Sequence, residues 1–480
     1  MKTKLVLLLF VLELTAGCAV HQSRVIQKPW DNGRLVVSQN GRFIQHENGE
    51  PFFWLGDTGW LLFQKLNRDE VEIYLENRRQ KGFNVIQAMA LHSLPEVNYY
   101  GDLAVADSNP AQPVTTSGNN PENKSEYDYW DHVDFVVETA ARKGIYIAIV
   151  PTWGSIVKGG RLTAESARTY GKWIAERYRD KPNIIWINGG DVRGDDHAEI
   201  WQILGNTIHQ TDSNHLMTFH PFGRTQSSTW FHSESWLDFN MFQSGHRRYD
   251  QRRPTDDIET WKGEDNWKYV LEDYEKEPRK PTIDGEPSYE NIPQGLHDPK
   301  EPYWHETDAR RYAYWSVFAG SFGHTYGNNS VMQMHKPDSG TGSFGVLNYW
   351  NEAIDDPGAG QMQYLKSLML SRPFFERIFD PSMIKNNGEK YDFVTVTRGK
   401  SYAFIYTYTG RSFDVTMGKI SGGKVRALWY NPRNGKSELS GYFDNEGIKR
   451  FDPPGEKAEG SDWVLVLDDT ENKFPVIDMR

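Results

Sequence analysis

Two carboxylates stand where the chain leaves a short apolar run. Asp191 follows the segment IIWINGG, and Glu286 follows TIDG, which contains a further acid, Asp284. Two opposed carboxylates without a cofactor suit glycoside hydrolysis: one acid is protonated and assists the leaving oxygen, and the other is ionised and attacks the anomeric carbon or activates water. Asp is also frequent at strand–helix junctions as a cap or turn residue, so a structural role stays open for Asp191 and Glu286. For Asp284, beside Gly285, we favour a turn.

Other polar and aromatic side chains follow the remaining apolar runs and belong to the same expected pocket. The histidines among them lie far apart in the sequence and no His-Glu-x-x-His motif is present, so we assign no metal ligand, although histidines that converge in a fold are an open alternative. A serine hydrolase would require a G-x-S-x-G turn at a strand end, and none is found there. We expect no cofactor. The candidate residues are Asp57, Trp60, Trp153, His220, Gln243, His246, His324 and Tyr326.

Eight apolar runs alternate with longer amphipathic segments, which is the pattern of repeated strand–helix units. Several runs are apolar at consecutive positions, as buried parallel strands are. The expected fold class is α/β, a (β/α)8 TIM barrel with its site at the carboxyl ends of the strands. An open doubly wound sheet is the rival, but its first turn would carry G-x-G-x-x-G, and this chain has GDTGW. We expect strands at 51–56, 83–91, 145–151, 183–189, 215–220, 239–243, 281–284 and near 321–327, and helices at 67–82, 129–144, 163–178, 196–210, 307–320 and 361–370.

After Asp380 the pattern changes to short strands separated by turn residues, without helical periodicity. This predicts a C-terminal antiparallel β-sandwich of about a hundred residues. We place the catalytic barrel at residues 30–376 and the sandwich at 377–480. The irregular loop 102–126 follows the second strand, where barrels place functional residues. We therefore expect it near the site.

The N-terminal segment MKTKLVLLLFVLELTAGC combines two lysines, an apolar run too short to span a bilayer, and small residues before Cys18. It resembles a bacterial lipoprotein signal, residues 1–17, after which the cysteine is acylated; an ordinary signal peptide with an incidental cysteine is the alternative. Cys18 is the only cysteine of the chain, so no disulfide is available. We expect a lipid anchor on Cys18 and a place in the bacterial cell envelope, either periplasmic or at the cell surface.

The amino-acid composition indicates which class of partner the protein binds. The net charge is −11, from 54 Lys and Arg against 65 Asp and Glu, which disfavours nucleic acid because phosphate binding needs a basic face. Aromatic residues make up 14% of the chain, and flat rings suit packing against sugars, although large cores use aromatic residues as well. A glycan is therefore a better candidate partner than a nucleic acid.

Five segments spread over separate strand ends carry a family resemblance: FFWLGDTGW, INGGDVRGD, the run from FHPFGRTQSS to FNMFQSGH, IDGEPSYE and RRYAYWSVFAGSFGHTYGNNS. They resemble the glycoside hydrolases of family 140, the apiosidases, whose barrel is followed by a β-sandwich of a collagen-binding type. The resemblance covers nearly the whole chain after the signal. It implies cleavage of the bond from D-apiose to galacturonic acid in side chains of the pectin rhamnogalacturonan-II. It also implies that Glu286 is the nucleophile and Asp191 the acid of a retaining reaction.

The resemblance gives roles to the other candidate residues as well. Trp60 or Trp153 would stack on a sugar ring, and the polar candidates would hold sugar hydroxyls, directly or through another residue. The implied partners are a pectic oligosaccharide and, through the lipid anchor, the membrane. Two alternatives stay open: a barrel glycosidase acting on another plant or host glycan, and a non-catalytic glycan-binding lipoprotein with a decayed barrel. The presence of both acids argues against the second.

Overall fold

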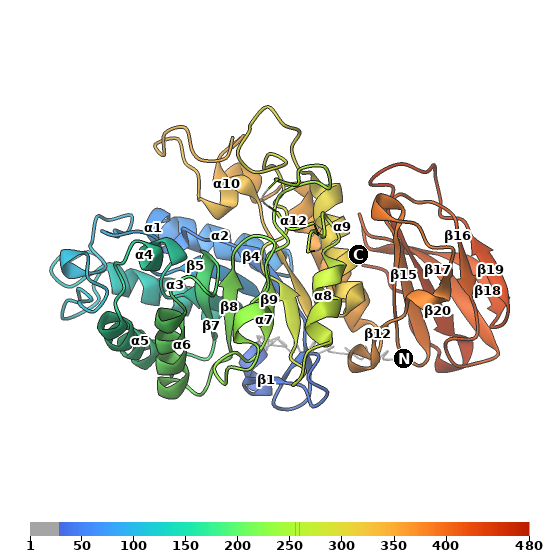
Figure 1. Ribbon diagram of the computed structural model, residues 1–480, viewed down its shortest axis with the longest axis horizontal. Helices are drawn as coiled ribbons and strands as arrows, with labels where there is room; N and C mark the ends of the chain where they lie inside the picture. Colours follow the sequence, from blue (N-terminus) through green and yellow to red (C-terminus); the bar gives the residue numbers. More distant parts are fainter. Residues whose placement is uncertain (1–27, 255, 259, 480) are drawn as a thin grey trace, which may run out of the picture.

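The computed structural model describes residues 28–254, 256–258 and 260–479, and it shows a barrel beside a smaller β-domain (Figure 1). Eight strands form the barrel, and each lies on a segment for which the sequence predicts a strand. Hydrogen-bonded neighbours among them run parallel. They are β4 Trp54–Thr58, β5 Val85–Met89, β6 Tyr146–Val150, β7 Ile184–Val192, β8 Met217–Pro221, β9 Asn240–Phe242, β10 Thr282–Asp284 and β11 Gly323–Tyr326.

Ladders join the strands in the order β11-β4-β5-β6-β7-β8, with β9 and β10 as a separate pair. Backbone hydrogen bonds at two further places close the ring: Asp238 N donates to Met217 O over 2.8 Å, and Phe322 N donates to Thr282 O over 3.2 Å. The (β/α)8 prediction is confirmed.

The six expected helices are present. Local signals explain their ends: Asn67 caps α2 in a reciprocal capping box with Glu70, and Gly144 ends α3 in a left-handed conformation at φ 75°. Helix α8 and five short α-helices were not predicted. The α-helices are α1 Leu62–Lys65, α2 Arg68–Gln80, α3 Tyr129–Lys143, α4 Gly154–Lys158, α5 Ala164–Tyr178, α6 Ala198–Thr211, α7 Ser228–Phe231, α8 Trp267–Tyr274, α9 Glu306–Ala319, α10 Asn329–Met332, α11 Trp350–Ala353 and α12 Pro357–Leu370; the 3-10 helices are η1 Pro29–Asn32, η2 Ala106–Ser108, η3 Phe374–Glu376, η4 Pro381–Met383, η5 Lys390–Asp392 and η6 Thr470–Asn472.

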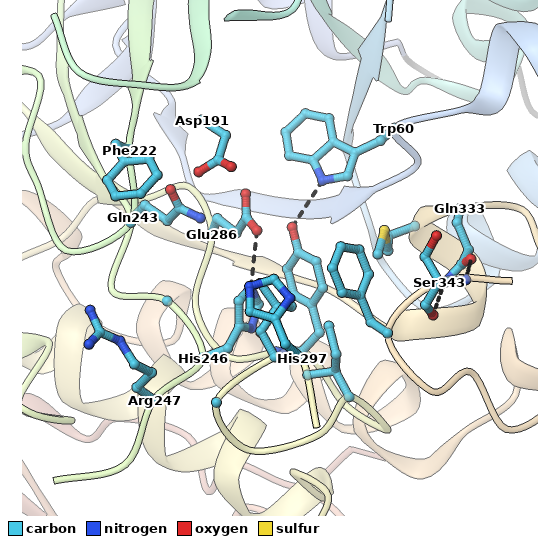
Figure 2. A pocket seen from close by; sticks show the side chains of 18 of the residues that line it. Trp60, Asp191, Phe222, Gln243, His246, Arg247, Glu286, His297, Gln333 and Ser343 are labelled. Carbon is cyan, nitrogen blue, oxygen red and sulfur yellow. Dashed lines mark hydrogen bonds and ion pairs between the residues drawn. The ribbon is translucent and has the colours of Figure 1, made fainter. Parts of the chain in front are cut away.

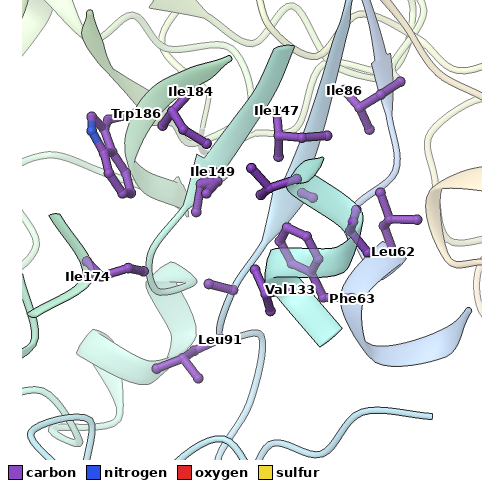
Figure 3. Close-up of a cluster of buried hydrophobic side chains, with 14 of the residues drawn as sticks. Leu62, Phe63, Ile86, Leu91, Val133, Ile147, Ile149, Ile174, Ile184 and Trp186 are labelled. Atoms are coloured by element: carbon purple, nitrogen blue, oxygen red, sulfur yellow. The ribbon is translucent and has the colours of Figure 1, made fainter. Parts of the chain in front are cut away.

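Alternate residues of the barrel strands supply two different cores. In β6, Ile147 and Ile149 point outward and pack with helix residues such as Val133 of α3 and Ile174 of α5 (Figure 3). The intervening positions of the same strand join an inner cluster with residues of the other strands. This use of both faces explains why the strand segments read as continuous apolar runs.

A small antiparallel sheet covers the amino ends of the barrel strands. It consists of β1 Leu35–Val37, β2 Ile44–His46 and β3 Pro51–Phe52. The rings of Trp30 and Phe52 pack edge-on against Tyr146, the first residue of β6, at centroid distances of 5.6 and 5.4 Å. The opposite end of the barrel is left for the site.

The C-terminal domain is an antiparallel β-sandwich, as predicted. One sheet has the order β12-β14-β15-β20-β17-β18 and the other has the order β13-β16-β19. The strands are β12 Ile378–Phe379, β13 Ile384–Lys385, β14 Val394–Arg398, β15 Tyr402–Thr407, β16 Phe413–Thr416, β17 Lys424–Asn431, β18 Lys436–Asp444, β19 Ile448–Phe451 and β20 Trp463–Asp469.

The sandwich packs firmly against the barrel through α9. Arg310 of α9 donates from Nε to Asp462 Oδ2 over 2.9 Å, and the two side chains are 1% and 0% exposed. Nearby, Tyr314 stacks on Tyr406 with ring centroids 4.7 Å apart. A buried ion pair and stacked rings therefore join the two domains.

In the described residues, no helix is long and apolar enough to cross a bilayer. The predicted signal at residues 1–17 and the predicted lipid site at Cys18 lie outside the part of the chain that the structure describes.

Candidate active site

A cavity of about 400 Å³ opens at the carboxyl ends of the barrel strands (Figure 2). Its walls come mainly from the segments that follow β4, β7, β8, β9 and β10 and from the loop around residues 332–344. Six of the predicted site residues line it: Trp60, Trp153, Asp191, Gln243, His246 and Glu286. The structure therefore brings both candidate carboxylates into one cavity.

Unusual backbone geometry presents Asp191 to the cavity. Gly189, Gly190 and Asp191 all have positive φ, at 86°, 115° and 48°, at the irregular end of β7. A Cβ on Gly190 would lie 2.4 Å from the Trp153 ring, and one on Gly189 would lie 2.6 Å from His220 O. Only glycine fits at those two positions, whereas Asp191 holds a left-handed conformation with a side chain. Strain of this kind collects at functional sites, where the surrounding fold enforces it.

Two histidines hold the Glu286 carboxylate. His220 Nε2 lies 3.1 Å from Glu286 Oε2, and His246 Nε2 lies 3.1 Å from Oε1. The backbone N–H groups of Asp191 and Tyr289 point at the Nδ1 atoms of His220 and His246 over 3.3 and 3.4 Å. Because each Nδ1 accepts, the ring proton of each neutral histidine is on Nε2, facing the carboxylate.

The two carboxyl groups have pKa values shifted in opposite directions. Burial acts to raise the pKa of Glu286, but the contacts of its carboxylate with His220 and His246 outweigh it and lower the pKa to about 2. Asp191 is open to the cavity, yet the walls remove much of the bulk water around its carboxyl; this burial raises its pKa, and the charge of Glu286 raises it further. An ionised and a protonatable carboxyl in one site give the pair of roles that glycoside hydrolysis uses.

The backbone before Glu286 is fixed by contacts across the barrel. Gln87 Nε2 of β5 donates to Gly285 O over 2.8 Å, and Gly285 N donates to Phe242 O of β9 over 2.8 Å. A Cβ on Gly285 would lie 2.4 Å from Met241 Sδ, so close packing excludes a side chain there. These contacts set the direction in which Glu286 leaves the end of β10.

The interpretation of Asp284 as a turn former is wrong. Asp284 is the last residue of β10 and is fully buried. It accepts from Ser244 Oγ over 2.6 Å and from Asn266 Nδ2 over 3.0 Å, and burial raises its pKa to about 6. It ties the segments after β9 and β10 together behind the site, so its role is structural although not that of a turn.

Two tryptophans form an aromatic wall. The rings of Trp60 and Trp153 lie 5.4 Å apart, and His220 packs against both at 5.4 and 5.7 Å. Trp60 Nε1 donates to Tyr289 OH over 3.0 Å, which fixes the wall relative to the Glu286 loop (Figure 2). Gln243 also lines the cavity, and its buried Oε1 atom has no hydrogen-bond partner among the described residues.

Four predicted binding residues do not line the cavity. His220 lies behind Glu286. Asp57 is fully buried, accepts from Arg78 Nε and from Tyr74 OH over 2.6 Å each, and so fixes α2 to β4. Tyr326 donates to Glu290, and His324 is buried with neither ring nitrogen bonded to a described residue. The structure does not support direct sugar contact for these four residues. They lie behind the cavity wall, among other residues of the protein.

Several residues that line the cavity were missed. Tyr289 comes three residues after Glu286, and its position within the motif IDGEPSYE was a usable signal. The others lie on loops without periodicity: Phe222, Arg224, Arg247, Arg253, His297, Gln333, Ser343 and Phe344. Loop 102–126, expected near the site, contributes nothing to the lining and instead packs on α3, where Trp130 Nε1 donates to Ala104 O over 2.8 Å.

The described residues contain no group of three or more His, Cys, Asp or Glu side chains placed to hold a metal ion.

Residues 38–376 match the family described as "Apiosidase-like, catalytic domain". The chain belongs to this family. Residues 378–468 of this apiosidase-like protein match a second family, described as "Putative collagen-binding domain of a collagenase". A comparison with curated proteins found no match.

Solved structures place the apiosidase-like protein among glycoside hydrolases. One described as "Glycoside hydrolase" is 51% identical, with a TM-score of 0.88 over 94% of this chain and 100% of its own. A glycoside hydrolase family 5 structure from Bacteroides vulgatus is 48% identical, with the same TM-score over 94% of this chain and 98% of its own. Another structure from that organism, 14% identical with a TM-score of 0.59, shares the fold over 91% of this chain and 82% of its own. The protein is a glycoside hydrolase.

Proposed function

We propose that the enzyme cleaves the bond between D-apiose and galacturonic acid in side chains of rhamnogalacturonan-II, with retention at the anomeric carbon. The observation that carries the assignment of roles is the carboxyl pair: Glu286 is held ionised between two histidine donors, and Asp191 faces the same cavity with a raised pKa. The choice of apiose is supported by the family match over residues 38–376.

In the first step, a Glu286 oxygen attacks the anomeric carbon and forms a bond to it, while the bond from that carbon to the leaving oxygen breaks. Asp191 gives its proton to the leaving oxygen, so the departing sugar leaves as an alcohol. The two histidines orient the carboxylate for this attack, because His246 Nε2 hydrogen-bonds to Oε1 and His220 Nε2 lies 3.1 Å from Oε2.

In the second step, Asp191 takes a proton from water, and that water oxygen attacks the anomeric carbon. The bond to Glu286 breaks, which frees the sugar and restores both carboxyl groups. Loss of the negative charge on Glu286 in the intermediate removes one cause of the raised Asp191 pKa, which helps Asp191 to act as a base in this step.

The test is release of apiose from rhamnogalacturonan-II oligosaccharides, followed by chromatography. We expect the native enzyme to release apiose and Glu286→Gln and Asp191→Asn to lose this activity. Asp195→Asn is a matched control, because Asp195 is an exposed acid four residues after Asp191 that pairs with Arg193. Retention of near-native release by Glu286→Gln would contradict the proposal. Hydrolysis of another glycan without release of apiose would favour a barrel glycosidase of different specificity.

We also propose that the enzyme works at the bacterial cell envelope, anchored by lipid on Cys18. The sequence of the first 18 residues supports this proposal. Expression with a radiolabelled fatty acid is expected to label the native chain and leave Cys18→Ala unlabelled and released from membranes. Equal labelling or equal membrane retention of both would contradict it.

A further inference from the structure

Three arginines line one side of the cavity in a protein whose net charge is −11. Arg224 follows β8, and Arg247 and Arg253 follow β9. Trp261 packs against two of them, with the Cζ atoms of Arg224 and Arg247 each 5.2 Å from its ring centroid. The cavity wall is therefore cationic at this place although the chain is acidic overall.

Arg224 forms no ion pair with a described residue, although the charge of Asp256 acts on it. Its guanidinium group makes no hydrogen bond or ion pair to any described residue, and its Nε and Nη2 atoms are buried. Burial and then the charge of Arg247 lower its pKa to about 10, so it stays protonated at neutral pH. A partly buried cation without an ion pair is unfavourable for folding, and Arg224 also has a left-handed conformation at φ 67°. Such a group acquires its partner when an anion binds.

The cluster formed by Arg224, Arg247 and Arg253 carries more positive than negative charge. Arg247 pairs with Asp256, the acid that the structure places in contact with this cluster. Arg253 is exposed at the rim, and its guanidinium has no partner in the described part of the chain. Three cations and one contacting anion therefore suit an acidic ligand.

The cluster lies on the side of Asp191. Phe222, two residues before Arg224, donates from its backbone N to the O of Val192, the neighbour of Asp191, over 2.9 Å. In Figure 2, Phe222 and Gln243 lie on the same side of Glu286 as Arg247, Gln333 and Ser343 lie on the opposite side, and the Asp191 carboxyl lies above Glu286 next to Phe222. A general acid stands beside the leaving oxygen, so the leaving sugar occupies the arginine side.

We propose that Arg224, Arg247 and Arg253 form a subsite for the carboxylate of a uronic acid in the leaving-group position. This inference rests on the proposed role of Asp191 as the acid, and it goes further by naming the residues that select a charged leaving sugar over a neutral one. Guanidinium groups bind carboxylates through paired, charge-assisted hydrogen bonds, and Trp261 holds two of the arginines in place for this contact.

The test is binding of galacturonate and of its uncharged methyl ester to the full chain, measured by calorimetry without turnover. The native enzyme is expected to bind galacturonate at least tenfold more tightly than the ester. In Arg224→Gln and Arg253→Gln, this preference is expected to fall below threefold. Arg193→Gln, which removes an exposed arginine paired with Asp195 outside the cavity, is expected to keep it.

A stability measurement separates this role from a structural one. Because Arg224 makes no hydrogen bond or ion pair to a described residue, Arg224→Gln is expected to unfold at the same temperature as the native enzyme or higher. Equal binding of acid and ester by the native enzyme, absence of binding of both, or an unchanged preference in the arginine variants would overturn the inference.

Failure of the proposed subsite and failure of the proposed function give different results. If galacturonate binds through the arginines but apiose is not released, the subsite stands and the glycosidic specificity is wrong. If apiose is released equally from free and methyl-esterified substrates, the function stands and the subsite is wrong.

Discussion

Replacing His246 by Phe tests how Glu286 is kept ionised. The variant removes one of two Nε2–H donors, each 3.1 Å from a carboxylate oxygen, and keeps a ring of similar size. A hydrogen bond to a charged group contributes about 1.5–3 kcal/mol, which equals about 1–2 pKa units. The pKa of Glu286, about 2 in the native protein, should therefore rise by about 1–2 units.

The direction of the pH effect follows from the charge that the histidines stabilise. The lowered pKa of Glu286 favours its ionised form. The histidine contacts therefore stabilise the folded protein above the ordinary pKa of 4.5, and this stabilisation is lost as the pH falls through about 2. Attack on the anomeric carbon requires the ionised form. The acid limb of kcat/KM in His246→Phe should therefore move to higher pH.

The assay is the pH dependence of kcat/KM for release of apiose, compared between the native enzyme and His246→Phe. His297→Phe is the matched control, because His297 lines the same cavity and packs near Phe344 without contacting either carboxylate. Its acid limb should coincide with that of the native enzyme. With both His220 and His246 replaced, no histidine opposes the effect of burial on Glu286, and its pKa should rise above the ordinary 4.5. An acid limb that does not move in His246→Phe would refute the reasoning.

Three further predictions follow from single contacts. Asp191→Asn should lower kcat by about 10²–10⁴-fold and lose the alkaline limb that the raised Asp191 pKa produces; added azide should restore turnover, and failure of azide would argue against a covalent intermediate. Gly285→Ala would place a Cβ 2.4 Å from Met241 Sδ and should destabilise the protein by about 1–3 kcal/mol in urea unfolding, with a lowered kcat; a native kcat would show that Glu286 is aimed by other contacts. Asp462→Asn should leave Arg310 unpaired at the domain interface and lower the free energy of unfolding by about 3–5 kcal/mol, whereas an independently folded sandwich would leave the barrel transition unchanged.

The barrel could be predicted from the sequence because each strand is buried on both faces. Segments such as IYIAIVP are apolar at every position, since Ile147 and Ile149 face the helices while their neighbours face the interior. Helix ends were equally legible where a side chain makes the cap, as Asn67 and Glu70 do. The short helices within the loops are too short to show a recognisable periodic pattern of apolar residues.

The site was predictable to the extent that it lies at strand ends. Asp191, Glu286, His246, Gln243, Trp60 and Trp153 were found in this way and all line the cavity. The same rule wrongly assigned Asp57 and Tyr326 to the cavity lining. The last residues of a strand point alternately to the barrel interior and to the outer layer. Asp57 contacts Arg78 and Tyr326 contacts Glu290 instead of lining the cavity.

Loop geometry was beyond the sequence argument. The residues next to Asp284 in the sequence did not reveal its burial. Asp284 contacts Ser244 and Asn266, which lie 40 and 18 residues away in the sequence. In the same way, the distance of loop 102–126 from the site and the meeting of Arg224 with Trp261 depend on the tertiary fold.

The central claim, that Glu286 is the nucleophile, is tested most directly by trapping the covalent intermediate. The native enzyme would be treated with a 2-fluoro-apiosyl fluoride, digested, and analysed by mass spectrometry. We predict one sugar adduct on the peptide that contains IDGEPSYE, located at Glu286, and no adduct in Glu286→Gln. An adduct on another residue, or hydrolysis of the reagent with inversion and without any adduct, would contradict it.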